Sequence, residues 1–262
     1  MALVACLTGV VPSAVAAEGQ VGTPALLATG KELVLRSSDL PRGWTSDDDA
    51  GECMDGSGPS SSAAGCSTTG VPRQQASDDK FAQCLGLPVS HVSMLTWKDE
   101  PGEPFTYLSP TFTAPGYSGL YQVPTLASAV TIEPSAAVQG RDLAAFSQPS
   151  FPRCFKVQEA WQMLAIAEQL GSARHVSMAF GPVHRVPEEA ATGVTAVGYT
   201  VSFTLRSPQH NVSALFAWVI LGAGRAEEVL KATSASAAPM PAAAVVMALG
   251  HLEGRLAAYA AR

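Results

Sequence analysis

Alternating apolar and polar positions predict several strands in the second half of the chain. Over residues 197–205 every odd-numbered position is apolar or aromatic, and every even-numbered position is small or polar. This period of two is typical of a strand with one buried face. Residues 212–221 are apolar on both parities, which predicts a central strand covered on both faces. Shorter patterns predict strands over residues 175–180 and 226–234, and another that ends at Pro134.

Apolar residues spaced three or four apart predict helices between and after these strands. Ser135 is a suitable N-cap for a helix that continues to about Phe146. A second helix runs from Pro152, a residue that favours the first helical turn, to Leu170. Pro241 precedes a final helix, and a shorter one is expected over residues 81–87. The buried stripe predicted for the final helix consists of Val245, Leu249, Leu252, Leu256 and Tyr259.

The order of these elements predicts an α+β fold. A strand and two helices precede a meander of strands, and a helix closes the chain. We therefore expect an antiparallel sheet of about five strands with helices packed on it, forming one domain over residues 31–262. Residues 18–30 are expected to be a linker, and residues 45–80, rich in Asp, Gly and Ser, a mobile polar insertion. Residues 88–120, rich in Pro and Gly, predict an irregular connection.

The first seventeen residues predict an export signal. They carry no charge, and their apolar run ends in the small residues Ala14, Ala16 and Ala17. The basic residues that usually open such a signal are absent, and the Leu3-Val4-Ala5-Cys6 segment has the form of a bacterial lipobox. Cleavage near Ala17, lipid modification of Cys6, and an uncleaved anchor or plain strand are therefore three open alternatives. Each of the first two predicts a secreted or cell-envelope protein.

Export would place the remaining cysteines in an oxidising compartment, where disulfides form. These cysteines are Cys53, Cys66, Cys84 and Cys154. Four cysteines allow three pairings. We favour Cys53–Cys66, which would enclose a Gly/Ser-rich loop, and Cys84–Cys154, which would tie an early segment to a helix start. A zinc site is disfavoured, because the chain has no C-x-x-C pair and no histidine at ligand spacing from a cysteine.

Charge and motifs exclude several functions. The net charge of −6 and the charged fraction of 15 % disfavour nucleic-acid binding, which needs a basic face. The apolar run at the N-terminus is too short to span a membrane. No hydrolase, zinc-protease, phosphate-loop or dinucleotide motif occurs, and the aspartates of residues 47–55 lack calcium-loop spacing. We assign no cofactor and no metal site, and interpret the histidines as surface or edge residues. They are His91, His175, His184, His210 and His251.

Several short motifs carry a resemblance to a known group of proteins. They are Asp39-Leu40-Pro41-Arg42-Gly43-Trp44, Cys84-Leu85, Ser109-Pro110-Thr111-Phe112 and Cys154-Phe155. In this pattern the chain resembles exported actinobacterial proteins of unknown function. Its overall plan is also similar to the extracellular sensor domain of a mycobacterial receptor Ser/Thr kinase. That resemblance implies a disulfide-tied α+β domain with a cleft over the sheet.

The aromatic residues of the irregular region are the candidate ligand contacts. They are Trp97, Phe105, Tyr107, Tyr117 and Tyr121. Aromatic residues on loops often line a ligand cleft, and burial as loop anchors is the competing interpretation. We expect a non-enzymatic exported binding or sensor-like domain for an apolar or amphipathic ligand. The alternatives are a structural or partner-binding envelope protein without a small ligand and, less favoured, a hydrolase.

Overall fold

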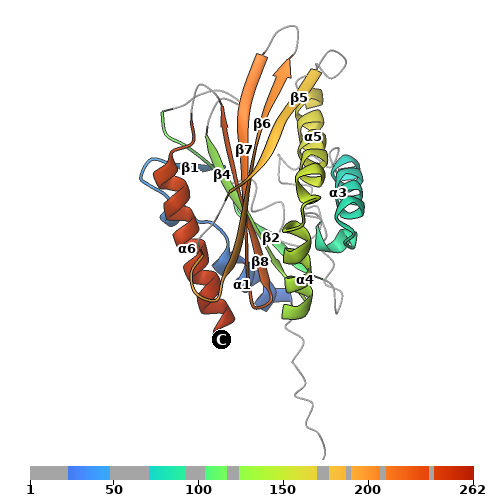
Figure 1. The fold of residues 1–262 in the computed structure, drawn as a ribbon. Coiled ribbons are helices and arrows are strands. Elements are labelled where there is room, and N and C mark those ends of the chain that lie inside the picture. Colours follow the sequence, from blue (N-terminus) through green and yellow to red (C-terminus); the bar gives the residue numbers. More distant parts are fainter. Residues whose placement is uncertain are drawn as a thin grey trace, which may run out of the picture.

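The structure is a computed structural model of the chain. It describes residues 23–47, 71–92, 104–116, 124–169, 177–186, 190–206, 211–235 and 239–262. Within these ranges eight strands form one antiparallel sheet (Figure 1). The strands are β1 (Thr45–Asp47), β2 (Phe105–Leu108), β3 (Thr111–Thr113), β4 (Thr125–Ile132), β5 (Ser177–Val186), β6 (Thr195–Arg206), β7 (Asn211–Ala223) and β8 (Ala226–Ala235). Their order is β1-β3-β4-β8-β7-β6-β5, and β2 also pairs with β4.

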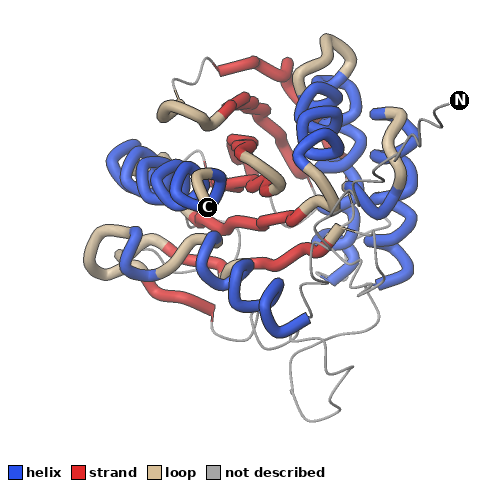
Figure 2. The backbone as a smooth tube through the Cα atoms, turned by 90° about the horizontal axis from the view of Figure 1, so that it is seen from below, coloured by secondary structure: helices blue, strands red, loops and turns tan. Residues whose placement is uncertain are grey.

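Helices lie on both faces of this sheet (Figure 2). They are α1 (Thr23–Leu33), α3 (Val71–Leu85), α4 (Ala136–Phe146), α5 (Phe151–Gln169) and α6 (Ala242–Ala260), with the short helices η1 (Ser37–Asp39) and η3 (Val89–His91). The core between the sheet and α1 and α6 contains Leu126, Val130 and Leu252, among others. The core on the opposite face contains Phe81, Phe151 and Trp218 from α3, α5 and β7. None of the helices in the described part of the chain combines the length and apolar character of a membrane span.

The predicted fold class is confirmed, but the expected number of strands is wrong. The α+β architecture, the antiparallel sheet and the C-terminal helix are all present. Eight strands replace the expected five because β1, β2 and β3 lie in segments predicted to be irregular. These strands are only three or four residues long, too short for a period of two to stand out, and their backbones pair with one another or with β4.

Two predicted boundaries also differ from the structure. Residues 23–30, expected as part of a linker, are helical and belong to α1. The polar insertion expected over residues 45–80 contains β1 at its start and the first ten residues of α3 at its end. The short helix predicted over residues 81–87 is the last part of this longer helix α3. The rest of the insertion, residues 48–70, lies outside the described residues.

The Asp-Leu-Pro-x-Gly-Trp motif ties the N-terminal segment to the final helix. Asp39 accepts a hydrogen bond from the Arg36 backbone N–H at 2.8 Å and pairs with Arg255 of α6. Leu40 is buried in the core, and Trp44 packs against it. Gly43 has a φ of +94°, in the left-handed region that favours glycine. The motif is therefore explained as a turn that anchors residues 36–44 on α6 and the sheet.

Strand β8 places two neighbouring acidic residues on opposite faces of the sheet. Glu227 pairs in register with Thr131 and Gly222 and faces the layer of α3, α4 and α5. Glu228 pairs with Val130 and Leu221 and faces α1 and α6. Glu227 is 5 % exposed and Glu228 is fully buried. Because adjacent strand residues point in opposite directions, the two carboxyl groups have different surroundings.

Candidate functional site

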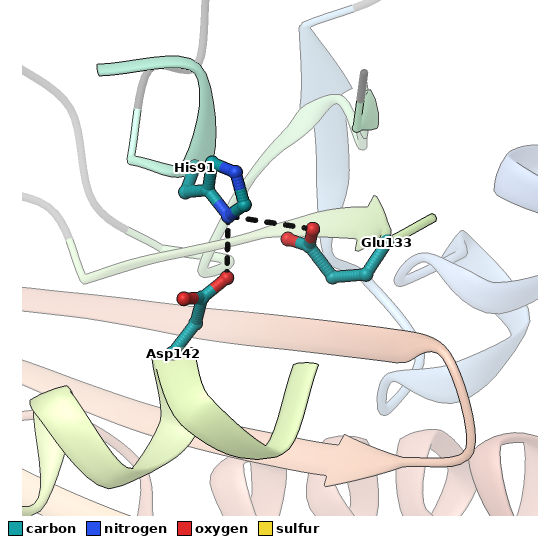
Figure 3. A group of neighbouring side chains, drawn as sticks. All are labelled: His91, Glu133 and Asp142. Carbon is teal, nitrogen blue, oxygen red and sulfur yellow. Dashed lines mark hydrogen bonds and ion pairs between the residues drawn. The ribbon is translucent and has the colours of Figure 1, made fainter. Parts of the chain in front are cut away.

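Three ionisable side chains from separate elements meet beside the sheet: His91, Glu133 and Asp142 (Figure 3). The His91 Nδ1 atom lies 2.6 Å from Asp142 Oδ2 and 3.6 Å from Glu133 Oε2. One potential ligand atom from each residue lies within 4.8 Å of the other two. An imidazole nitrogen and two carboxylate oxygens therefore converge on one point.

The His91 side is positioned by the disulfide between α3 and α5. Cys84, next to the last residue of α3, is bonded to Cys154 of α5. The chain then leaves the helix at Gly86, with a φ of +71°, and forms η3, in which the His91 N–H donates to Pro88 O at 3.1 Å. His91 follows Cys84 closely in sequence, so the disulfide holds it near the layer formed by α3 and α5.

Backbone hydrogen bonds fix the other two residues. Glu133 directly follows β4, where its N–H donates to Arg225 O at 2.8 Å and its carbonyl accepts from Arg225 Nε at 2.7 Å. Asp142 lies within α4, whose first turn is capped by a 3.2 Å hydrogen bond from Val138 N–H to Ser135 Oγ. The β4–α4 connection therefore brings both carboxyl groups to the same end of the sheet.

The site is nearly inaccessible to solvent and is strongly acidic. The side chains of Asp142 and Glu133 are 0 % and 1 % exposed, and that of His91 is 10 % exposed. Burial, and then the negative charge of Asp142, raise the pKa of Glu133 to about 8. Within the described part of the chain, Asp142 Oδ1 and Glu133 Oε2 have no hydrogen-bond partner. Arg141, a mostly exposed side chain, has its Nε 3.6 Å from Asp142 Oδ1, which is an ion pair but not a hydrogen bond.

A small cavity adjoins His91, and a further carboxyl group, that of Glu227, also lines it. Its volume is about 30 Å³, and its lining includes His91, Thr106, Thr131 and Glu227. The Glu227 Oε2 atom has no hydrogen-bond partner among the residues that the structure describes. Burial raises the pKa of Glu227, and the charges of Glu133 and Asp142 raise it further. Glu227 is therefore close enough to Glu133 and Asp142 to interact with them electrostatically.

The cluster has the donor chemistry of a metal site. Carboxylate oxygens and imidazole nitrogens are common protein ligands for divalent cations. Buried carboxylates are costly unless they are paired, protonated or bound to a metal. A cation at the point of convergence would compensate His91, Glu133 and Asp142 together. The residues present therefore fit a bound cation.

The structure separates the predicted ligand contacts into two groups. Phe105 and Tyr107 are buried in β2, where Tyr107 packs against Gly30 of α1. Trp97, Tyr117 and Tyr121 lie outside the described residues. The apolar ligand site therefore stays a prediction, and the two residues that are described belong to the core between the sheet and α1.

The predicted Cys84–Cys154 disulfide is confirmed. Cys53, Cys66 and Cys6 lie outside the described residues, so the second disulfide and the lipid modification stay predictions. Trp218 is buried on the central strand, as its apolar surroundings predict.

Sequence reasoning missed the acidic cluster. It interpreted His91 as a surface or edge residue, whereas the side chain is nearly buried and contacts Asp142. One signal was present: Asp142 stands one residue before Leu143 and four before Phe146, on the stripe that α4 turns to the core. Burying an acid at such a position is costly unless its charge has a partner, so a buried partner could have been expected.

Comparison of the chain with protein-family models, curated proteins and solved structures gave no match. The function of the chain is therefore inferred from the geometry of the cluster.

Proposed function

We propose that this protein is a non-enzymatic, exported binding domain of the cell envelope whose ligand is a divalent metal cation held by His91, Glu133 and Asp142. The observation that carries the proposal is the convergence of three ligand atoms within 4.8 Å, two of them from buried carboxylates, with carboxylate oxygens that lack hydrogen-bond partners among the described residues. Export is supported by the apolar first seventeen residues and by the Cys84–Cys154 disulfide, a bond that persists in oxidising compartments.

A proton-sharing network is the alternative explanation of the cluster. In that case His91 Nδ1–H donates to Asp142, and Glu133 is protonated because of its raised pKa. A proton on Glu133 would remove its negative charge but would leave Asp142 Oδ1 without a hydrogen bond among the described residues. A divalent cation would compensate the whole cluster, so the cation accounts for more of the geometry than the proton does.

The size of the cavity favours binding over catalysis. A volume of about 30 Å³ holds an ion or about one water molecule, not an organic substrate. The aromatic side chains of Phe81, Phe146 and Trp218 also line it and close its apolar side. An ion held by His91, Glu133 and Asp142 would tie η3, the end of β4 and α4 together, which suits a domain whose conformation changes when the ion binds.

Cation binding is tested by calorimetric titration of the metal-free full chain with Zn²⁺, Mn²⁺, Ca²⁺ and Mg²⁺. We expect one ion per chain to bind for at least one of these metals, and binding to be lost in His91→Gln. The matched control is His184→Gln, because His184 is exposed on β5 and lies outside the cluster. Absence of binding for every ion, or equal binding by His91→Gln and the wild type, would overturn the proposal.

A further inference from the structure

Glu227 is the buried group of this cluster that the three-residue site leaves unexplained. We infer that the bound ion is a first-row transition metal ion of the Zn²⁺ type, and that Glu227 completes its site from across the cavity through a water ligand of the ion. This inference rests on the proposed function, since it names the ion and the further residue of the same site.

The donor set selects against Ca²⁺ and Mg²⁺. Both are hard cations that prefer oxygen ligands, whereas imidazole nitrogen suits Zn²⁺ and its first-row neighbours. His91 Nδ1 faces both carboxyl groups, so any ion at the point of convergence must accept a nitrogen ligand. The site therefore favours an ion for which nitrogen is an ordinary ligand.

The small space beside His91 also disfavours Ca²⁺ and Mg²⁺. Ca²⁺ takes six to eight oxygen ligands, and Mg²⁺ usually keeps several waters. The cavity of about 30 Å³ is lined by His91 and Glu227 but not by Glu133 or Asp142, so it lies to one side of the point of convergence. It has room there for about one water on the ion, not for a hydration shell. Four-coordinate Zn²⁺ has ligand bonds of about 2.1 Å, which place neighbouring ligand atoms roughly 3.4 Å apart. The 3.6 Å between His91 Nδ1 and Glu133 Oε2 is close to that spacing, whereas His91 Nδ1 and Asp142 Oδ2 are at hydrogen-bond distance, 2.6 Å. Binding of the ion would replace this hydrogen bond and move the two atoms apart.

Glu227 is placed to contact the fourth ligand instead of the ion itself. It lines the same cavity as His91, yet it is not among the three residues whose ligand atoms lie within 4.8 Å of one another. Its Oε2 atom is buried without a hydrogen-bond partner. A water bound to the ion in the cavity would donate a hydrogen bond to this oxygen. Glu227 is therefore a positioning residue for the water ligand.

Other polar groups around the cavity already have partners. Thr106 Oγ1 and Thr131 Oγ1 lie 3.1 Å apart and hydrogen-bond to each other. Gln158 Nε2 donates to Asp78 Oδ1 at 3.4 Å. Among the described residues that line the cavity, Glu227 thus offers a buried oxygen without a hydrogen bond.

The test compares Glu227→Gln with Glu228→Gln in the metal-free full chain. Both substitutions remove a buried acid from β8, but Glu228 faces the opposite side of the sheet. We expect Glu227→Gln to weaken Zn²⁺ binding roughly 10- to 100-fold, as is typical for groups that support metal ligands. Glu228→Gln should leave Zn²⁺ affinity unchanged. The visible spectrum of bound Co²⁺, which reports coordination geometry, should change in Glu227→Gln only.

Competition experiments test the class of ion. Millimolar Ca²⁺ or Mg²⁺ should fail to displace Zn²⁺ from the wild type. Displacement by either ion, or Zn²⁺ binding and a Co²⁺ spectrum that are the same in Glu227→Gln and the wild type, would overturn the inference while leaving cation binding intact. Failure of every ion to bind would instead overturn the proposed function.

Discussion

Replacing Asp39 with Asn should destabilise the protein strongly at neutral pH. Arg255 Nη1 and Nη2 donate to Asp39 Oδ1 and Oδ2 at 2.9 and 2.8 Å, so the pair is bidentate. The Asp39 residue is 3 % exposed and the Arg255 side chain 21 % exposed. The pair joins the segment after α1 to the C-terminal helix α6. The Asp39→Asn substitution removes the negative charge of this side chain and keeps its shape.

The expected loss in the free energy of unfolding is about 2–3 kcal/mol. Removing one partner of a fully buried ion pair costs about 3–5 kcal/mol, because a buried charge is left uncompensated. Here Arg255 is partly exposed and also donates to Leu33 O and Val34 O at 3.2 and 3.0 Å. These contacts persist in the variant, so we place the loss below the range for full burial.

The loss should depend on pH in a defined direction. Burial alone would raise the pKa of Asp39, but the hydrogen bonds from Arg255 and the Arg36 N–H and the Arg255 charge lower it below its usual value. A carboxyl group with a lowered pKa stabilises the fold above its unfolded pKa, and this contribution is lost as the pH falls through the folded pKa. The deficit of the variant should therefore be complete at pH 7 and should shrink below about pH 4.

Urea denaturation of the wild type and Asp39→Asn at a series of pH values measures this deficit. Asp79→Asn is the control, because Asp79 is an exposed acid on α3. A loss no larger than that of the control at pH 7, or a deficit that stays constant into acid, would refute the reasoning.

Two further substitutions test the packing of α4 on the sheet. In Gly222→Ala the new Cβ would collide with the side chain of Gln139, so we expect a loss of about 1–3 kcal/mol in thermal denaturation. The control is Gly140→Ala on α4, the helix that carries Gln139. Its new Cβ would have no contact within 4 Å, so this variant should not be destabilised; a destabilised Gly140→Ala would contradict this account. In Tyr199→Phe the 2.7 Å hydrogen bond to Phe146 O is lost, which should cost about 1–2 kcal/mol, and an unchanged unfolding midpoint would count against it.

Long, regular patterns made most of the central sheet predictable. Strands β6 and β7 run for twelve and thirteen residues, so their patterns of buried positions repeat often enough to be recognised. Helix α4 begins directly after the predicted cap at Ser135. The C-terminal helix turns Leu252 and Leu256 into the core, as their spacing predicts.

Elements that depend on tertiary partners were not predictable. Strands β1 and β3 have three residues each and pair with each other, and β3 in turn pairs with β4. The first part of α3 carries Arg73, Gln74 and Gln75 in sequence, which gives no apolar stripe to recognise. Its final turns are held by Phe81 and by the disulfide at Cys84, contacts that a local pattern does not contain.

The cluster was hidden because its members are far apart in sequence. His91 and Asp142 are separated by 51 positions, and each is an isolated residue without a motif around it. Only the pairing of β4 with β8 and the β4–α4 connection bring Glu133, Asp142 and Glu227 to the same side of the sheet. Residue spacing alone contains no information about this arrangement.

The two acids of β8 show why a cation is expected at one place in the core. Burial raises the pKa of Glu228 to about 8; a hydrogen bond with Ser128 and the positive charge of Arg255 oppose that effect, and the negative charge of Asp39 adds to it. Burial raises the pKa of Glu227 as well, but there the charges of Glu133 and Asp142 act in the same direction as burial. The two residues are adjacent glutamates, and both are buried. The face with Glu228 has a positive partner within the chain, whereas on the face with Glu227 the charges that act most strongly among the described residues are negative. A cation bound between His91, Glu133 and Asp142 would give Glu227 the compensation that Arg255 gives Glu228.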